Sequence, residues 1–268
     1  QKACKGIDSV IHLAYLQGTQ FFYTKPELVL DIAVNGMVNV IDGCIKENVM
    51  ELVVASSSEV YNMPPKIPTD ETAPLVIPDI LNPRYSYAAG KIISEMMTIN
   101  YGRRHFDRAI IFRPHNVYGP DMGWEHVIPQ LILKTKRICD ETKSKQIQLR
   151  LQGTGNETRA FIFIDDFVDG LMLVLEKGEH LGIYHIGTMD EMAIADVAKE
   201  IGSYFGKKVE IVPGEIAKGS PTRRCPDITK LKKLGFRPKK TFKEGLRATA
   251  KWYDQNADKQ PKISEETG

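Results

Sequence analysis

The fold of this chain is decided by two short runs, Ala55-Ser56-Ser57-Ser58-Glu59-Val60-Tyr61 and Tyr85-Ser86-Tyr87-Ala88-Ala89-Gly90-Lys91. The first run follows the apolar residues 51–54, which predicts a buried strand whose carboxyl end carries hydroxyl groups. The second run opens a helix on which Tyr87 and Lys91 are four residues apart. Residues at this spacing lie on one helix face, one turn from each other.

The spacing of Tyr87 and Lys91 suits acid–base chemistry. A phenol has a pKa of roughly 10 and is a poor base at neutral pH. An ammonium group one turn away in a dry site stabilises the phenolate and lowers that pKa. With a serine hydroxyl to share the proton, such a pair removes a proton from an alcohol while hydride leaves its carbon. Most isolated Tyr-x-x-x-Lys pairs are a half-buried tyrosine and a surface lysine, so the upstream serines carry much of this interpretation.

Composition places the chain among ordinary globular proteins. Of its 268 residues 42% are hydrophobic and 26% are charged, and a net charge of +2 gives no reason to expect nucleic acid or a membrane as partner. The cysteines are scattered without a Cys-x-x-Cys pair, so we expect reduced thiols, no disulfide and no metal site. No apolar run approaches about 18 residues and no signal peptide is recognisable, so we expect a cytoplasmic protein.

Strands and helices alternate early in the chain. We predict strands at 7–14, 108–113, 146–151, 182–187 and 209–213, and helices at 26–48, 194–205 and 241–253. Early alternation followed by a mixed C-terminal region predicts an α/β domain with a smaller lobe. Ligands of such folds bind at the carboxyl ends of the parallel strands.

Several motifs resemble those of one enzyme family. Ser57-Ser58-Glu59-Val60-Tyr61 and Tyr87-Ala88-Ala89-Gly90-Lys91 are similar to the active-site motifs of the extended short-chain dehydrogenase/reductases, which are NAD-dependent nucleotide-sugar epimerases, dehydratases and decarboxylases. The resemblance implies a Rossmann-like doubly wound parallel sheet and a smaller mixed α/β lobe that binds the nucleotide sugar. The residues expected in the partial NAD-binding domain are 1–120 and 160–188, and those expected in the lobe are 121–159 and 189–268.

The resemblance also implies roles for individual residues. The expected catalytic residues are Ser57, Glu59, Tyr87 and Lys91. The expected NAD-binding residues are Leu13, Ala14, Ala55, Ser56, Tyr87, Lys91 and Pro114. The residues expected to bind the sugar and diphosphate are Asn116, Arg159 and Arg224.

The chain departs from the family pattern at several places. Tyr15 stands where the family has the last alanine of a His-Leu-Ala-Ala stretch, and Ala33 stands where an asparagine belongs when the chain is aligned on Gly36. The glycine-rich turn that holds the cofactor pyrophosphate at a helix N-terminus does not precede the first strand, where Gly6 is alone. We therefore expect the N-terminal strands of the sheet to be missing, and the chain to be a fragment that binds NAD poorly by itself.

The resemblance implies an NAD-dependent nucleotide-sugar epimerase or dehydratase, an isomerase or lyase that acts through a 4-keto sugar. The stretches around Arg159 and Arg224 are closer to the decarboxylase branch, so that alternative stays open. A non-catalytic remnant that binds a nucleotide or a partner protein stays open as well. As partners we expect a nucleotide-diphosphate sugar and a second copy of the chain in a homodimer.

Overall fold

The computed structural model describes residues 1–16, 18–216, 219 and 221–261. By its internal contacts the chain divides into two compact units. Unit 1 comprises Gln1–Val117, Arg159–Glu191 and Arg223–Lys239, and unit 2 comprises Tyr118–Thr158, Met192–Thr222 and Lys240–Gly268.

Unit 1 includes the segment 223–239, which the sequence led us to expect in the lobe with the rest of 189–268. The reason is hydrophobic packing, because Ile228, Leu231 and Phe236 are buried in the same core cluster as the central strands. Apolar surface removed from water stabilises this arrangement by roughly 25 cal/mol per Å². The segment therefore packs in the core of unit 1 despite its distance along the chain.

Unit 1 is built around a four-stranded parallel sheet, which confirms the predicted α/β class. In spatial order its strands are β1 (Ser9–His12), β2 (Glu51–Ala55), β3 (Arg108–Pro114) and β8 (Gly182–Ile186). The interiors of β2 and β3 are apolar and buried, as is typical of a parallel sheet covered on both faces. Parallel pairing places the carboxyl ends of β1, β2 and β3 at one edge of the sheet.

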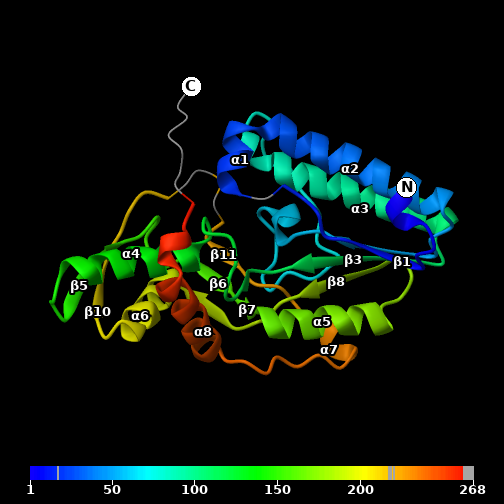
Figure 1. The fold of residues 1–268 in the computed structure, drawn as a ribbon. Helices are drawn as coiled ribbons and strands as arrows, with labels where there is room; N and C mark the ends of the chain where they lie inside the picture. Colours follow the sequence, from blue (N-terminus) through cyan, green and yellow to red (C-terminus); the bar gives the residue numbers. More distant parts are fainter. Residues whose placement is uncertain (17, 217–218, 220, 262–268) are drawn as a thin grey trace. The chain divides into compact units, whose positions relative to one another are not determined.

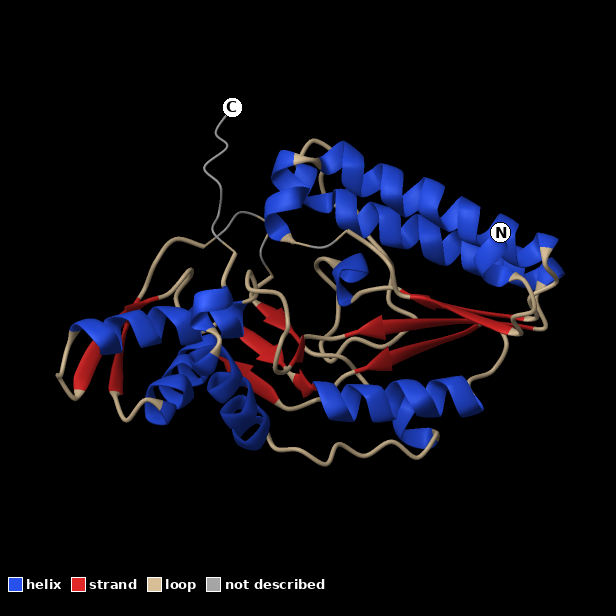
Figure 2. Ribbon diagram, viewed as in Figure 1, coloured by secondary structure: helices blue, strands red, loops and turns tan. Residues whose placement is uncertain are grey.

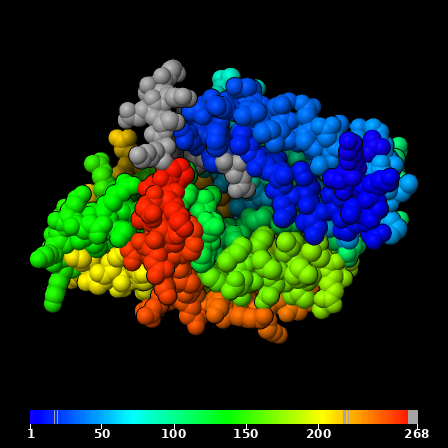
Figure 3. Space-filling view, in the orientation of Figure 1, coloured from blue at the N-terminus to red at the C-terminus, as the bar shows by residue number. Residues whose placement is uncertain are grey.

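Helices cover both faces of this sheet (Figure 1; Figure 2). α2 (Pro26–Lys46) and α3 (Ser86–His105) lie side by side on one face, and α5 (Ile164–Lys177) and α7 (Thr229–Lys233) lie on the other. Small residues let α2 and α3 approach closely, since a Cβ built on Gly90 would lie 2.6 Å from the Cβ of Ala33. The outer surface of α5 is drawn in yellow-green in the space-filling view (Figure 3).

Among the described helices, α2 alone is long and apolar enough to cross a membrane, judged by length and composition. Core helices of soluble proteins and signal sequences meet the same criteria, so this evidence is weak. In the structure α2 buries Val29, Ala33, Met37, Ile41 and Cys44. The absence of a membrane partner stays a prediction.

Unit 2, as far as the structure describes it, contains a two-stranded parallel sheet and three helices. The strands are β5 (Gln146–Arg150) and β10 (Lys208–Val212), and the helices are α4 (Val127–Glu141), α6 (Ile194–Tyr204) and α8 (Phe242–Gln255). α8 begins with a capping box, in which the Thr241 hydroxyl accepts from the Glu244 N–H and the Glu244 carboxylate accepts from the Thr241 N–H.

Short elements complete the described fold. They are α1 (Thr19–Thr24), β4 (Val117–Tyr118), β6 (Thr158–Ala160), β7 (Ile162–Phe163), β9 (Glu191–Ala193) and β11 (Arg223–Arg224). β11, β6 and β9 form a small sheet in that order, and β4 pairs with β7. Two 3-10 turns, Ser58–Tyr61 and Pro83–Tyr85, flank the loop between β2 and α3.

Candidate active site

Helix α3 carries Tyr87 and Lys91 in its first two turns, as the sequence predicts. Both residues are buried, with 4% and 3% of their surface exposed. The Nζ of Lys91 lies 5.8 Å from the centre of the Tyr87 ring and donates a hydrogen bond of 2.8 Å to the carbonyl oxygen of Ala55. The structure therefore brings the pair to the carboxyl end of β2.

The charge of Lys91 depends on its burial. Burial lowers the pKa of Lys91 to about 7, although the carboxylate of Glu95 opposes this shift. Glu95 follows Lys91 by four residues and shares its helix face. At neutral pH the amine is close to its midpoint, so a small change in its surroundings changes its charge.

Three serines, 56–58, follow the last residue of β2, and two of them make different contacts. Ser56 is buried, and its hydroxyl donates to Oε1 of Glu95. Ser57 caps the turn Ser58–Tyr61, because its Oγ accepts from the Glu59 N–H at 3.2 Å. A hydroxyl that accepts through its oxygen keeps its hydrogen as a donor. Ser57 therefore keeps a donor with which it can hydrogen-bond a ligand.

Aromatic rings cover the pair on α3. Phe22 of α1 stacks on Tyr87 with ring centres 4.9 Å apart, and Tyr15 meets the same ring edge-on at 5.1 Å. The Tyr15 ring also faces the ammonium group of Lys91, whose Nζ is 3.7 Å from the ring centre. This apolar cover lowers the local dielectric and strengthens every electrostatic interaction beneath it.

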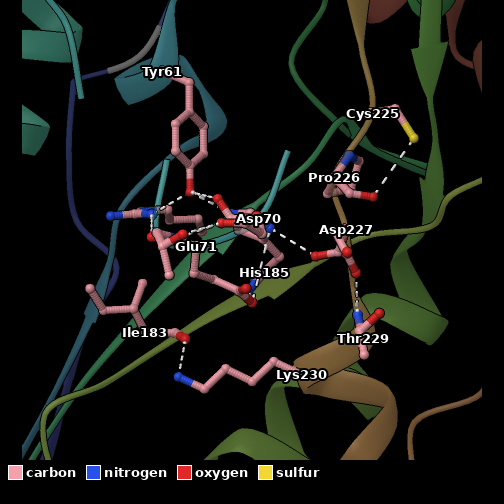
Figure 4. Close-up of polar contacts among 12 residues, drawn as sticks. Tyr61, Asp70, Glu71, Ile183, His185, Cys225, Pro226, Asp227, Thr229 and Lys230 are labelled. Carbon is pink, nitrogen blue, oxygen red and sulfur yellow. Dashed lines mark hydrogen bonds and ion pairs between the residues drawn. The ribbon is translucent and has the colours of Figure 1, made fainter. Parts of the chain in front are cut away.

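A buried polar network fixes α3 against the sheet. Arg113, in β3, donates to the carboxylate of Glu95 through Nε at 2.8 Å and Nη2 at 2.6 Å. Arg113 also donates to the Tyr61 hydroxyl, which lies 2.6 Å from Nε2 of His185. Figure 4 shows Tyr61 and His185 meeting beside Asp70, whose carbonyl oxygen accepts from the Tyr61 hydroxyl. The network joins α3 to β3, β8 and the turn after β2.

Glu59 lies among three arginines, which we call the arginine cluster: Arg84, Arg159 and Arg224. Oε1 of Glu59 accepts from Nη1 of Arg224 at 2.6 Å, and 29% of the Glu59 side chain is exposed. Burial disfavours the carboxylate, but Arg224, Arg84 and Arg159 outweigh burial and hold the pKa of Glu59 below its usual value. Nη2 of Arg224 is buried and has no hydrogen-bond partner among the described residues. The cluster therefore keeps Glu59 ionised and retains a donor for an anionic ligand.

Asn116 has a left-handed backbone with φ of 41° after β3. Its Nδ2 donates to the carbonyl oxygen of Ala160 at 3.0 Å, and its own carbonyl accepts from the Ile162 N–H at 3.3 Å. The side chain that the sequence assigns to the substrate thus holds the segment that carries Arg159. A direct contact of Asn116 with the sugar stays a prediction.

The residues predicted to bind NAD gather where the parallel strands end. Leu13 and Ala14 follow β1, Ala55 and Ser56 lie at the end of β2, and Pro114 ends β3. Lys91 uses one N–H on Ala55 and has two more, beside the phenol of Tyr87. Ribose hydroxyls pair with donors of this kind, and the binding of NAD by these residues stays a prediction.

Sequence reasoning missed Glu95, Arg113 and Arg84. A charged residue that ends an apolar strand, as Arg113 follows 109–112, indicates a buried partner of opposite charge. An acidic residue four positions after Lys91 indicates a contact on the same helix face. No local pattern marks Arg84, which approaches Glu59 only through the fold.

The sequence is similar to enzymes from Arabidopsis thaliana that are named for reactions of UDP-sugars. It is 31% identical over 265 residues to the trifunctional UDP-glucose 4,6-dehydratase/UDP-4-keto-6-deoxy-D-glucose 3,5-epimerase/UDP-4-keto-L-rhamnose-reductase, a match that covers 95% of this chain and 37% of that protein. It is 31% identical over 246 residues to UDP-glucuronic acid decarboxylase 5, covering 90% of this chain and 68% of that protein. The chain thus spans little more than a third of the first relative.

The fold is similar to that of a dTDP-glucose 4,6-dehydratase from Streptomyces venezuelae solved with NAD bound, with a TM-score of 0.81, 26% identity and coverage of 96% of this chain and 76% of that one. A UDP-N-acetylglucosamine 4-epimerase from Methanobrevibacter ruminantium has the same fold, with a TM-score of 0.82, 23% identity and coverage of 95% and 79%. These neighbours confirm the Rossmann-like architecture. Because the model of the NAD dependent epimerase/dehydratase family matches residues 1–187, more than half of the sequence, the chain belongs to that family.

Proposed function

We propose that this chain provides the catalytic centre of an NAD-dependent nucleotide-sugar epimerase or dehydratase that acts through a 4-keto sugar. The observation that carries the proposal is the pair on α3, in which Lys91 is anchored on Ala55 beside the ring of Tyr87 at the carboxyl end of β2. Family membership and the UDP-sugar enzymes among the relatives support it.

In this proposal each residue acts on the proton or on the sugar. Tyr87 removes the proton of the C4 hydroxyl, Lys91 stabilises the phenolate and binds the nicotinamide ribose, and Ser57 shares the transferred proton. Bound NAD supplies the hydride acceptor. The pKa of Glu59 lies below its usual value, so Glu59 is ionised at neutral pH. From the family resemblance we assign it the acid/base role in the step after oxidation.

The diphosphate of the substrate is assigned to Arg159 and Arg224. Guanidinium groups match phosphate oxygens with paired N–H donors, and Nη2 of Arg224 is an unused donor in the part of the chain that is described. We further propose a homodimer in the cytoplasm, with no nucleic-acid or membrane partner, because nothing in the charge balance favours either.

A second candidate is a nucleotide-sugar decarboxylase. Arg84 favours it, because this member of the arginine cluster is not assigned to the diphosphate and a uronic acid substrate brings a carboxylate that needs such a partner. UDP-glucuronic acid decarboxylase 5, of which the chain covers 68%, gives this candidate weight. The substrate separates the two candidates, since a dehydratase takes UDP-glucose and a decarboxylase takes UDP-glucuronic acid.

The test is Tyr87→Phe in the whole protein that contains this chain, assayed with NAD and each of the two UDP-sugars. Loss of a proton-transferring group should lower kcat by about 10²–10⁴-fold while the sugar affinity measured by calorimetry changes little. Tyr101→Phe is the matched control, because Tyr101 is 38% exposed on the same helix and should leave kcat unchanged.

Three outcomes would count against the proposal. A Tyr87→Phe protein with more than a tenth of the parental kcat would remove Tyr87 from the chemistry. Equal losses in the Tyr101→Phe protein would show a general effect of altering α3. A parental protein that binds the sugars and turns over neither would favour a non-catalytic binding role.

A further inference from the structure

Tyr15 occupies a space that exists because its neighbours Gly90 and Ala33 are small residues. A Cβ built on Gly90 would lie 2.1 Å from the Tyr15 hydroxyl oxygen and 2.6 Å from the Cβ of Ala33. The hydroxyl itself is buried and has no hydrogen-bond partner among the described residues. Leaving a buried hydroxyl unpaired is unfavourable, so the ring and not the hydroxyl accounts for this placement.

The ring of Tyr15 contacts both residues of the pair on α3. Its face lies 3.7 Å from Nζ of Lys91, and it meets the Tyr87 ring at an interplanar angle of 82°. An aromatic face attracts a cation, and the attraction is strongest where water is excluded. We propose that Tyr15 is a positioning residue for Lys91, whose ammonium group it holds in the charged form beside Tyr87.

Among the other groups that face Lys91, the Glu95 carboxylate also favours the charged amine, since it raises the Lys91 pKa. The Glu95 carboxylate is shared with Arg113, to which it is bound by two hydrogen bonds. His12 of β1 has its pKa lowered by burial and by the charge of Lys91, so it is neutral at pH 7 and adds no charge. The phenols of Tyr15 and Tyr87 are the other titratable groups beside Lys91, and burial raises the pKa of Tyr15, so Tyr15 adds no charge at pH 7. Burial lowers the pKa of Lys91 and Glu95 raises it, and in this proposal the Tyr15 face, 3.7 Å from Nζ, acts in the same direction as Glu95.

The inference rests on the proposed function only for the use made of Lys91, so its test does not need activity. Lysine labelled with ¹³C at Cε is incorporated, the Lys91 signal is assigned with Lys91→Arg, and its pKa is read by NMR between pH 5.5 and 9.5. Tyr15→Phe keeps the ring face and should keep the Lys91 pKa. Tyr15→Leu removes the ring and should lower that pKa by about 1 unit, as expected for loss of a desolvated cation–π contact.

A control and an activity measurement complete the test. Tyr23→Leu changes a 45% exposed tyrosine of α1 and should leave the Lys91 titration unchanged. In the active protein, the alkaline loss of kcat/KM should begin about 1 pH unit lower in Tyr15→Leu than in Tyr15→Phe. An unchanged or raised Lys91 pKa in Tyr15→Leu overturns the inference. If Tyr15→Leu lowers the Lys91 pKa but the parent protein shows no turnover, the inference is supported and the proposed function is refuted.

Discussion

Removing the Glu95 carboxylate should strongly destabilise unit 1. Glu95 and Arg113 are 4% and 2% exposed, and two hydrogen bonds of 2.8 Å and 2.6 Å join them. Glu95→Ala leaves a buried guanidinium group without its counter-ion, which costs about 3–5 kcal/mol in comparable buried pairs. The Tyr61 hydroxyl and the Glu71 carbonyl oxygen still accept from Arg113, so we expect the lower end of that range.

Urea unfolding followed by two probes measures this effect. Both tryptophans, Trp124 and Trp252, lie in unit 2, so fluorescence reports on unit 2 whereas far-ultraviolet circular dichroism reports on both units. Asp169→Ala is the control, because Asp169 and its partner Lys239 are exposed, and the unfolding curve should stay close to that of the parent protein.

A double-mutant cycle completes the experiment. If the cost comes from an unpaired charge, Glu95→Ala combined with Arg113→Met should lose clearly less stability than the two single changes summed. A loss below about 1 kcal/mol for Glu95→Ala, or additive losses in the cycle, would refute the reasoning.

Two further predictions concern Glu59 and His185. Glu59→Gln should preserve oxidation of the sugar and slow the following step by about 10²–10⁴-fold, so that reduced cofactor accumulates and is visible by absorbance. An unchanged rate of product formation would show that Glu59 takes no part in the reaction and would favour simple epimerisation. Burial lowers the pKa of His185 to about 4, below the value of roughly 6.5 in the unfolded chain, so its contribution to stability is present above pH 6.5 and is lost as the pH falls toward 4. His185→Gln should reduce the slope of unfolding free energy against pH between 6.5 and 5.5, by up to roughly 1.4 kcal/mol per unit, and an equal slope in both proteins would contradict the assigned protonation state.

The elements that the sequence predicts well are those whose pattern is local. β2 forms at the apolar run before Ala55, and α3 forms where Tyr87 and Lys91 are four residues apart. Each pattern specifies structure over a few neighbouring residues. The helix predicted at 26–48 is found as Pro26–Lys46 for the same reason. A local residue pattern is enough to predict these elements, because backbone geometry sets the spacing of residues on one face of a helix or strand.

The parts that escaped prediction depend on residues distant in sequence. Arg113 contacts Glu95 and Tyr61 across 18 and 52 positions, and Tyr61 meets His185 across 124. The sequence marks Tyr15 as a departure from the family pattern, but its contact with Lys91 follows from packing that no single stretch encodes. Such contacts are fixed by tertiary packing, which local propensity does not report.

Asn116 shows how a substitution can impair substrate binding from a position that need not contact the substrate. Its amide and its carbonyl clamp the chain on either side of Phe161, immediately after Arg159. A weaker sugar affinity in an Asn116 variant would therefore report displacement of the neighbouring guanidinium as readily as a lost contact. Combining substitutions at the two positions distinguishes these causes: if Asn116 acts only through Arg159, its loss should have no further effect once Arg159 is gone.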